Sequence, residues 1–228
     1  MTILAAIIEP LSKQVSLGEV AYHKLKEIII QGEFPPNEKL TVRAVAGALG
    51  VSTTPARDAI NRLLSEGALV YAGPKTVVIP PLTMEILDEI TSARLALEGL
   101  AAEKSVSFIS DADIAQLEKL QEIINIGLDE SDYRTVLRAN RDFHFLVYTR
   151  SNWPRVVSMI ESLWLQIGPS LNQLYPEFAF HRKGVSNHLW IMEGLRSRDA
   201  QKVRSGFEQD LRDGYDRISA FLKDAADK

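Results

Sequence analysis

The sequence has 228 residues, and its 26 Lys plus Arg against 30 Asp plus Glu give a net charge of −4. This balance argues against a protein that coats polyanions over its whole surface, but it leaves room for a basic patch on one face. Because Cys is absent, disulfides, thiolate metal sites and cysteine nucleophiles are excluded, and any metal must be held by nitrogen and oxygen. The composition suits a reducing compartment, and a cytoplasmic location is expected.

The chain opens with an apolar run from Met1 to Ile8. This run has no basic flank, and Glu9 and Pro10 cut it short of a signal-peptide core. No other run approaches the ~20 apolar residues that a membrane-spanning helix needs. We therefore expect no membrane association.

Three helices are predicted in the first 70 residues. Apolar residues recur at helical spacing over 17–31. Thr41 is typical of the N-cap of a short second helix, which Gly50 ends. Ser52 or Thr53 begins the third helix three residues later. Such a tight connection between the second and third helices is typical of a helix-turn-helix.

A change of period follows the third helix. Residues 68–71 and 76–79 are rich in β-forming side chains and flank a Gly-Pro turn, which predicts a hairpin. Three helices and a hairpin make a winged helix-turn-helix, whose third helix can enter the major groove of DNA.

About 60 residues of this part of the chain carry a pattern with many fixed spacings. Its positions are Tyr22, Leu25, Ile29, Gly32, Pro36, Leu40, Leu49-Gly50-Val51-Ser52, Pro55, Arg57, Ala59, Leu63 and Glu66-Gly67. The pattern resembles that of the GntR family of bacterial transcription regulators.

Candidate DNA contacts follow from geometry and from this resemblance together. Thr53, Thr54 and Arg57 begin the third helix, where side chains and free backbone N–H groups can meet bases and phosphates, and Arg57 can read guanine. The resemblance adds three residues, one in the second helix and two in the wing: Arg43, Gly73 and Lys75.

Three features of these candidates leave alternatives open. Ser52 is more typical of a helix cap than of a base contact. Many relatives carry a basic residue where Thr53 stands. As surface groups, Arg43 could instead pair with Glu38, and Arg57 with Asp58 or Asn61.

Two consecutive prolines, Pro80 and Pro81, divide the chain. They fix two φ angles, so no helix crosses this point, and a linker is expected at 79–82. Residues 1–80 carry 8 basic and 7 acidic side chains, net +1, and residues 81–228 carry 18 and 23, net −5. We predict a DNA-binding domain over 1–80 and a separate, acidic domain over 81–228.

The second domain is predicted to be all helix, so the whole fold is mainly α. Residues such as Thr83, Ser110, Ser131 and Asp199 are suitable N-caps, and Asp113 completes a capping box with Ser110. Six antiparallel helices can enclose one core that holds a ligand or a metal. The helices are expected over 83–107, 111–127, 131–150, 154–174, about 178–197 and 199–224.

Polar residues interrupt the apolar stripes of three of these helices. Asn140 and His144 share the stripe of the third helix, His188 lies with Leu189 on that of the fifth, and Asp210 lies on that of the sixth. His188 and Asp210 are each 11 residues from Asp199, and equal distances from an antiparallel turn place two residues at the same height. These four residues are therefore predicted to converge, as nitrogen and oxygen ligands suited to Zn, Ni, Mn or Fe.

The second domain contains the motifs Arg94-x-x-x-Glu98, Phe143-His144, Ser151-Asn152, His188 and Asp199-Ala200. With these motifs, residues 83–224 resemble the FCD effector domain of the FadR subfamily of GntR regulators. Many FCD domains bind a divalent metal through one Asp and three His, and the metal then receives an organic acid.

The resemblance implies ligand roles for the four converging residues. His144 and His188 match the family, whereas Asn140 stands for the Asp and Asp210 for the last His. Two imidazoles and one carboxylate remain a competent metal-binding set. The alternative is a metal-free pocket in which the four side chains hydrogen-bond to one another.

Effector contacts are expected at the same place. His144 and His188 would lie beside the effector, and the resemblance puts Arg94 close to the pocket. As an alternative, Arg94 could pair with Glu98 as an i,i+4 couple.

The sequence thus predicts a ligand-controlled regulator rather than an enzyme. We expect a repressor that binds a pseudo-palindromic DNA operator as a homodimer and responds to a small organic acid. One alternative is a metalloenzyme that uses the His/Asp site, although no metalloprotease, di-iron, phosphate-loop or Gly-x-Ser-x-Gly motif is present. Another is a winged domain that contacts only proteins.

Overall fold

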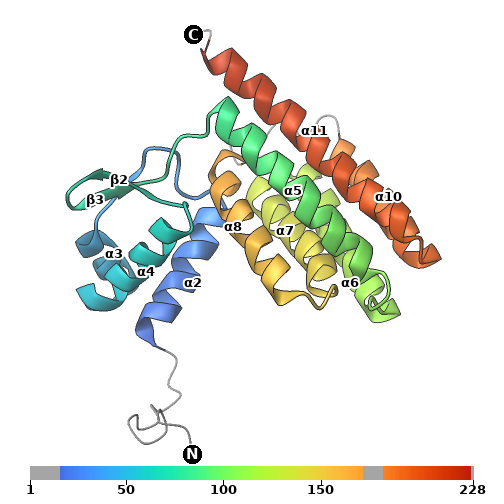
Figure 1. The fold of residues 1–228 in the computed structure, drawn as a ribbon, viewed down its shortest axis with the longest axis horizontal. Coiled ribbons are helices and arrows are strands. Elements are labelled where there is room, and N and C mark those ends of the chain that lie inside the picture. The colour runs from blue at the N-terminus through green and yellow to red at the C-terminus, as the bar shows by residue number, and fades with distance from the viewer. Residues whose placement is uncertain (1–15, 172–181, 227–228) are drawn as a thin grey trace, which may run out of the picture.

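The computed structural model describes residues 16–171 and 182–226 (Figure 1). The chain forms a small N-terminal unit and a larger helical bundle beside it. The N-terminal unit contains α2 (Leu17–Ile30), β1 (Lys39–Leu40), α3 (Val42–Leu49), α4 (Thr53–Ser65), β2 (Val70–Gly73) and β3 (Thr76–Val78). It is a winged helix-turn-helix, as predicted.

The caps of α3 and α4 explain the tight turn between them. Thr41 accepts a hydrogen bond from the backbone N–H of Ala44, and Gly50 ends α3 in the left-handed conformation. Ser52 occupies the N-cap position of α4, but its side chain makes no capping hydrogen bond. The Ser52 hydroxyl is therefore not engaged in capping.

The wing is part of a three-stranded antiparallel sheet with the order β1-β3-β2. The predicted hairpin is β2 and β3, with an irregularity between Tyr71 and Gly73. The short strand β1, which pairs with β3 through Lys39 and Leu40, was not predicted because two residues give no periodic signal.

Within the described residues, six further helices build the bundle, as predicted. They are α5 (Met84–Ser105), α6 (Asp111–Asp129), α7 (Tyr133–Thr149), α8 (Pro154–Leu171), α10 (Lys183–Ser197) and α11 (Ala200–Ala226). The parts of the predicted helices over 172–174 and 178–181 lie outside the described residues. None of the helices within the described ranges is long and apolar enough to cross a membrane.

Two expectations for the bundle were wrong in detail. The N-cap of α7 is Asp132, whose side chain accepts from the N–H of Thr135, and not Ser131, which has a positive φ of 59°. Leu189 is 53% exposed and does not share the buried face of α10 with His188. It is one residue along from His188, and one residue turns a helix by about 100°.

The α10 and α11 helices lie side by side (Figure 1), and a small residue sets their distance. A Cβ atom on Gly206 would lie 2.6 Å from Cγ1 of Ile191. Glycine therefore lets the two helices approach closely, which brings His188 of α10 near Asp210 of α11.

The α8 helix joins the two units. Leu165 belongs to the core of the N-terminal unit, and Gly168 packs against the backbone of Ile30 in α2. Lys26 of α2 forms an ion pair with Glu161 of α8, with 2.8 Å between Nζ and Oε2. The units therefore share a packed interface in addition to the 79–82 linker.

Candidate functional site

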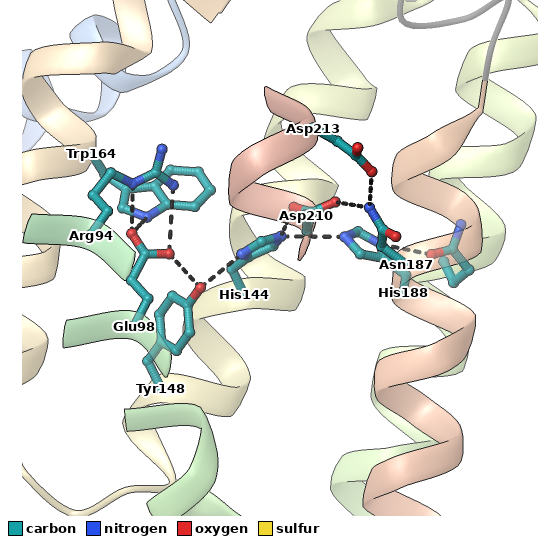
Figure 2. Close-up of polar contacts among 10 residues, drawn as sticks. Arg94, Glu98, His144, Tyr148, Trp164, Asn187, His188, Asp210 and Asp213 are labelled. Carbon is teal, nitrogen blue, oxygen red and sulfur yellow. Dashed lines mark hydrogen bonds and ion pairs between the residues drawn. The ribbon is translucent and has the colours of Figure 1, made fainter. Parts of the chain in front are cut away.

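Three of the four predicted ligands meet inside the bundle (Figure 2). The Nε2 atom of His144 lies 3.3 Å from Nε2 of His188 and 3.4 Å from Oδ2 of Asp210. The ligand atoms of all three lie within 4.8 Å of one another. Asn140, one turn before His144, lines the same cavity, and its side chain makes no hydrogen bond within the described ranges.

This donor set fits a divalent cation. Both imidazoles are 1% exposed, so water does not compete for their nitrogens. Two nitrogens and one carboxylate oxygen are Lewis bases, and their mutual approach in a buried place is favourable when a positive charge lies between them. The amide oxygen of Asn140 would add a fourth, weaker donor.

The charges of these residues are those that metal binding requires. Burial would raise the pKa of Asp210, but its contacts with His144, His188 and Asn187 outweigh burial and lower the pKa to about 2. Burial lowers the pKa of His188 to about 3, since its effect exceeds the opposite effect of Asp210. At neutral pH the carboxyl is ionised and the His188 imidazole is neutral, as in a metal ligand.

A network of buried polar side chains surrounds the two histidines. His188 Nδ1 lies 2.8 Å from Oε1 of Gln121, and the His188 ring stacks on Phe143 with 4.0 Å between ring centroids. His144 Nδ1 lies 2.9 Å from the hydroxyl of Tyr148. Burial and the neighbouring Glu98 carboxylate raise the pKa of Tyr148 well above its ordinary value, so the phenol stays protonated.

Sequence reasoning missed Gln121 and Tyr148. Gln121 is a polar residue on the buried stripe of α6, so the pattern that singled out Asn140 could have found it. Tyr148 lies one turn after His144, and a tyrosine in a core needs a partner for its hydroxyl.

Arg94 satisfies both readings of the sequence. Its Nε lies 2.6 Å from Oε1 of Glu98, and its side chain also lines the cavity beside Trp164 (Figure 2). Glu98 accepts further hydrogen bonds from Trp164 and Tyr148. Arg94 is therefore held in place at the cavity wall by a buried carboxylate.

The cavity has a volume of about 100 Å³ and is mostly apolar away from the His/Asp cluster. Its apolar wall includes Ile124, Leu128, Val136, Leu137, Ile167, Leu211 and Ile218. Since a 150 Å³ apolar cavity holds benzene, about 100 Å³ suits a ligand of a few non-hydrogen atoms.

A second candidate site lies on the N-terminal unit. Four of the seven predicted DNA contacts, Arg43, Thr53, Arg57 and Lys75, line one groove between α3, α4 and the wing. None of the described residues that line it is acidic. Ser52 and Thr54 are exposed at the start of α4, and Gly73 lies in the wing, but none of these three lines the groove.

The surface-pair alternatives for the two arginines are not seen. Within residues 16–171 and 182–226, Arg43 makes no ion pair with Glu38, and Arg57 makes none with Asp58 and no hydrogen bond to Asn61. Both guanidinium groups are exposed and available to an anion.

Comparison with known proteins decides the family. Residues 17–79 match the bacterial regulatory proteins of the gntR family, and residues 89–213 match the FCD domain. The chain belongs to the GntR family. It is a GntR regulator with an FCD domain, and the prediction of a transcriptional regulator rather than an enzyme is confirmed.

Relatives support this assignment over most of the chain. The HTH-type transcriptional regulator McbR of Escherichia coli K12 is 32% identical over 194 residues, which are 84% of this chain and 88% of McbR. The gluconate operon transcriptional repressor of Bacillus subtilis 168 is 25% identical over 221 residues, 91% of this chain and 87% of that protein.

Solved structures show the same fold. The structure of E. coli McbR/YncC superposes with a TM-score of 0.84 at 29% identity and covers 91% of this chain and 99% of that chain. A putative GntR regulator from Rhodococcus sp. RHA1 gives a TM-score of 0.74 at 19% identity, over 90% of this chain and 99% of its own. The fold of this GntR regulator is thus that of its relatives.

Proposed function

We propose that this GntR regulator is a repressor that binds a pseudo-palindromic operator as a homodimer. A small carboxylate, bound on a divalent metal in the FCD domain, controls its affinity for DNA. Residues 1–80 form the DNA-binding domain and residues 81–228 the effector and dimerisation domain. The observation that carries the proposal is the cluster of His144, His188 and Asp210, in a chain whose N-terminal unit has a cationic groove with no acidic side chain among its described lining residues.

The groove on the N-terminal unit supports the DNA-binding role. Arg57 reads a base edge in the major groove from α4, and Arg43 binds a phosphate or a base from α3. The start of α4 offers the hydroxyls of Ser52, Thr53 and Thr54. The wing, with Gly73 and Lys75, follows the adjacent minor groove.

The low positive charge of the DNA-binding domain supports a homodimer. Residues 1–80 carry a net charge of only +1, so one copy has few phosphate contacts and binds weakly. Two copies on two half-sites combine their binding energies, and a two-fold operator matches a two-fold protein.

The metal is held by His144, His188 and Asp210, with the amide oxygen of Asn140 as a fourth donor. Zn, Ni, Mn or Fe suit two imidazoles and a carboxylate. When bound, the metal supplies a Lewis-acidic position for a carboxylate ligand. The side chains of Arg94, His144 and His188 surround that ligand, and Arg94 contributes positive charge at the cavity wall.

A gel-shift experiment tests the whole proposal. Metal-loaded protein at low salt should shift DNA from its own promoter or neighbouring genes, and one member of a panel of small carboxylates should weaken the shift. Arg57→Ala should abolish the shift, whereas Lys24→Ala, which removes an exposed charge of α2 outside the groove, should retain it. Failure of the dimeric wild-type protein to bind any of these fragments would contradict the proposal.

A further inference from the structure

We propose that Gln121 and Tyr148 are positioning residues, which hold both site histidines in the tautomer that directs the Nε2 lone pairs toward Asp210. The consequence for metal affinity rests on the proposed metal site, whereas the tautomers themselves do not. A neutral imidazole carries its proton on one nitrogen only, and the hydrogen bond at that nitrogen decides which.

The tautomer of His188 is set by an amide of fixed orientation. Gln121 donates through its Nε2 to Oδ1 of Asn125 at 3.0 Å, so its carbonyl oxygen Oε1 points at His188. A carbonyl oxygen only accepts, so Nδ1 of His188 carries the proton. Gln121 is 4% exposed, which leaves no water to replace it. The Nε2 lone pair of His188 then faces His144.

The tautomer of His144 is set by a chain of two hydrogen bonds. The hydroxyl of Tyr148 donates to Oε2 of Glu98 at 2.5 Å, and a hydroxyl has one proton to give. The phenol oxygen must therefore accept from Nδ1 of His144, at 2.9 Å. The second nitrogen of this ring, Nε2, then presents a lone pair to Asp210.

Glu98 fixes the direction in which the hydroxyl of Tyr148 donates its hydrogen bond. It is fully buried, and it also accepts from Arg94 at 2.6 Å and from Trp164 at 3.0 Å. A carboxylate paired with an arginine in this way accepts hydrogen bonds and has no proton to donate. The proton of Tyr148 thus points to Glu98 and away from His144.

The result is a site assembled before a cation arrives. The helices α7, α10 and α11 each supply one ligand atom. Nε2 of His144 lies 3.3 Å from Nε2 of His188 and 3.4 Å from Oδ2 of Asp210. Partners at the second nitrogen of a ligating histidine are worth 10- to 100-fold in metal affinity. Gln121 and Tyr148 occupy that position on His188 and on His144.

Tautomers are read directly from long-range ¹H–¹⁵N NMR spectra of the imidazole rings, in chelator-treated protein at alkaline pH where free imidazoles are neutral. Both rings should show the proton on Nδ1. Gln121→Leu should remove the preference for the Nδ1 proton at His188 only, and Tyr148→Phe should remove it at His144 only. Tyr22→Phe, which removes a hydroxyl bonded to Glu66 far from the site, should change neither. A wild-type proton on Nε2 of either ring would overturn the proposal.

Zn²⁺ affinity, measured by competition with a chelating dye, gives the second readout. Gln121→Leu and Tyr148→Phe should each weaken binding about 10- to 100-fold. Gln121→Glu keeps an acceptor at His188, so this variant should bind Zn²⁺ with an affinity close to that of the wild-type protein. Wild-type affinity in both weakening variants would also overturn the proposal. If the wild-type protein binds no metal, the metal part of the proposed function fails, and the NMR spectra still decide the tautomers.

Discussion

The contact between α2 and α8 can be tested with one methyl group. A Cβ atom on Gly168 would lie 2.9 Å from both Cα and the carbonyl oxygen of Ile30. These are backbone atoms that cannot rotate away, so Gly168→Ala must push α2 and α8 apart. Overpacking of this kind costs about 1–3 kcal/mol.

The same substitution has an opposing effect on the helix. Alanine is favoured over glycine inside a helix by about 1 kcal/mol. Because the clash is with backbone on the far side, we expect the larger overpacking values and a net loss of about 2 kcal/mol. For a chain of this length that lowers Tm by about 4–8 °C.

Gly47 supplies the matched control. It lies in α3, and a Cβ atom there would meet nothing within 4 Å. Gly47→Ala should therefore raise Tm by about 2–4 °C through helix propensity alone. Differential scanning calorimetry of both variants measures the difference. A Tm for Gly168→Ala at or above that of the wild-type protein would refute the close packing of α2 on α8.

Three further predictions concern charges. Asp113 has its pKa lowered mainly by hydrogen bonds from Arg150, so it stabilises the folded state above its unfolded pKa, and this stability is lost as pH falls through the folded value. Arg150→Met should flatten the acid side of the curve of unfolding free energy against pH, and an unchanged curve would contradict this reading. Asp210→Asn keeps the shape but removes the charge, and should weaken Zn²⁺ binding at least 10-fold in dye competition, an effect that equal affinities would disprove. Arg43→Ala should weaken operator binding by about 1–3 kcal/mol in fluorescence anisotropy, whereas a change below 2-fold would remove Arg43 from the interface.

Local patterns predicted most of the fold. Caps such as Thr41 and Thr83 and the prolines at 80 and 81 mark boundaries that the structure keeps within a few residues. The failures were local as well. Asp132 and Ser131 are both acceptable caps, and the backbone of Ser131, in a left-handed conformation, leaves the cap to its neighbour.

The candidate site was predictable where it depended on one helix or one hairpin. His188 and Asp210 meet because α10 and α11 are antiparallel and equal in distance from their turn. The contacts of Gln121 with His188 and of Glu98 with Tyr148 could not be predicted, because each joins two helices that are not neighbours in sequence, and spacing along the chain does not place such helices.

The order of residues along α8 has a mechanical consequence. Trp164 packs in the bundle core against His144, the next residue, Leu165, is fully buried in the core of the N-terminal unit, and Gly168 follows one turn after Trp164. Neighbouring residues of a helix cannot move independently, since the backbone hydrogen bonds fix their separation. A movement of the α8 backbone at Trp164 therefore also moves Leu165, so α8 connects the wall of the cavity to the core of the N-terminal unit.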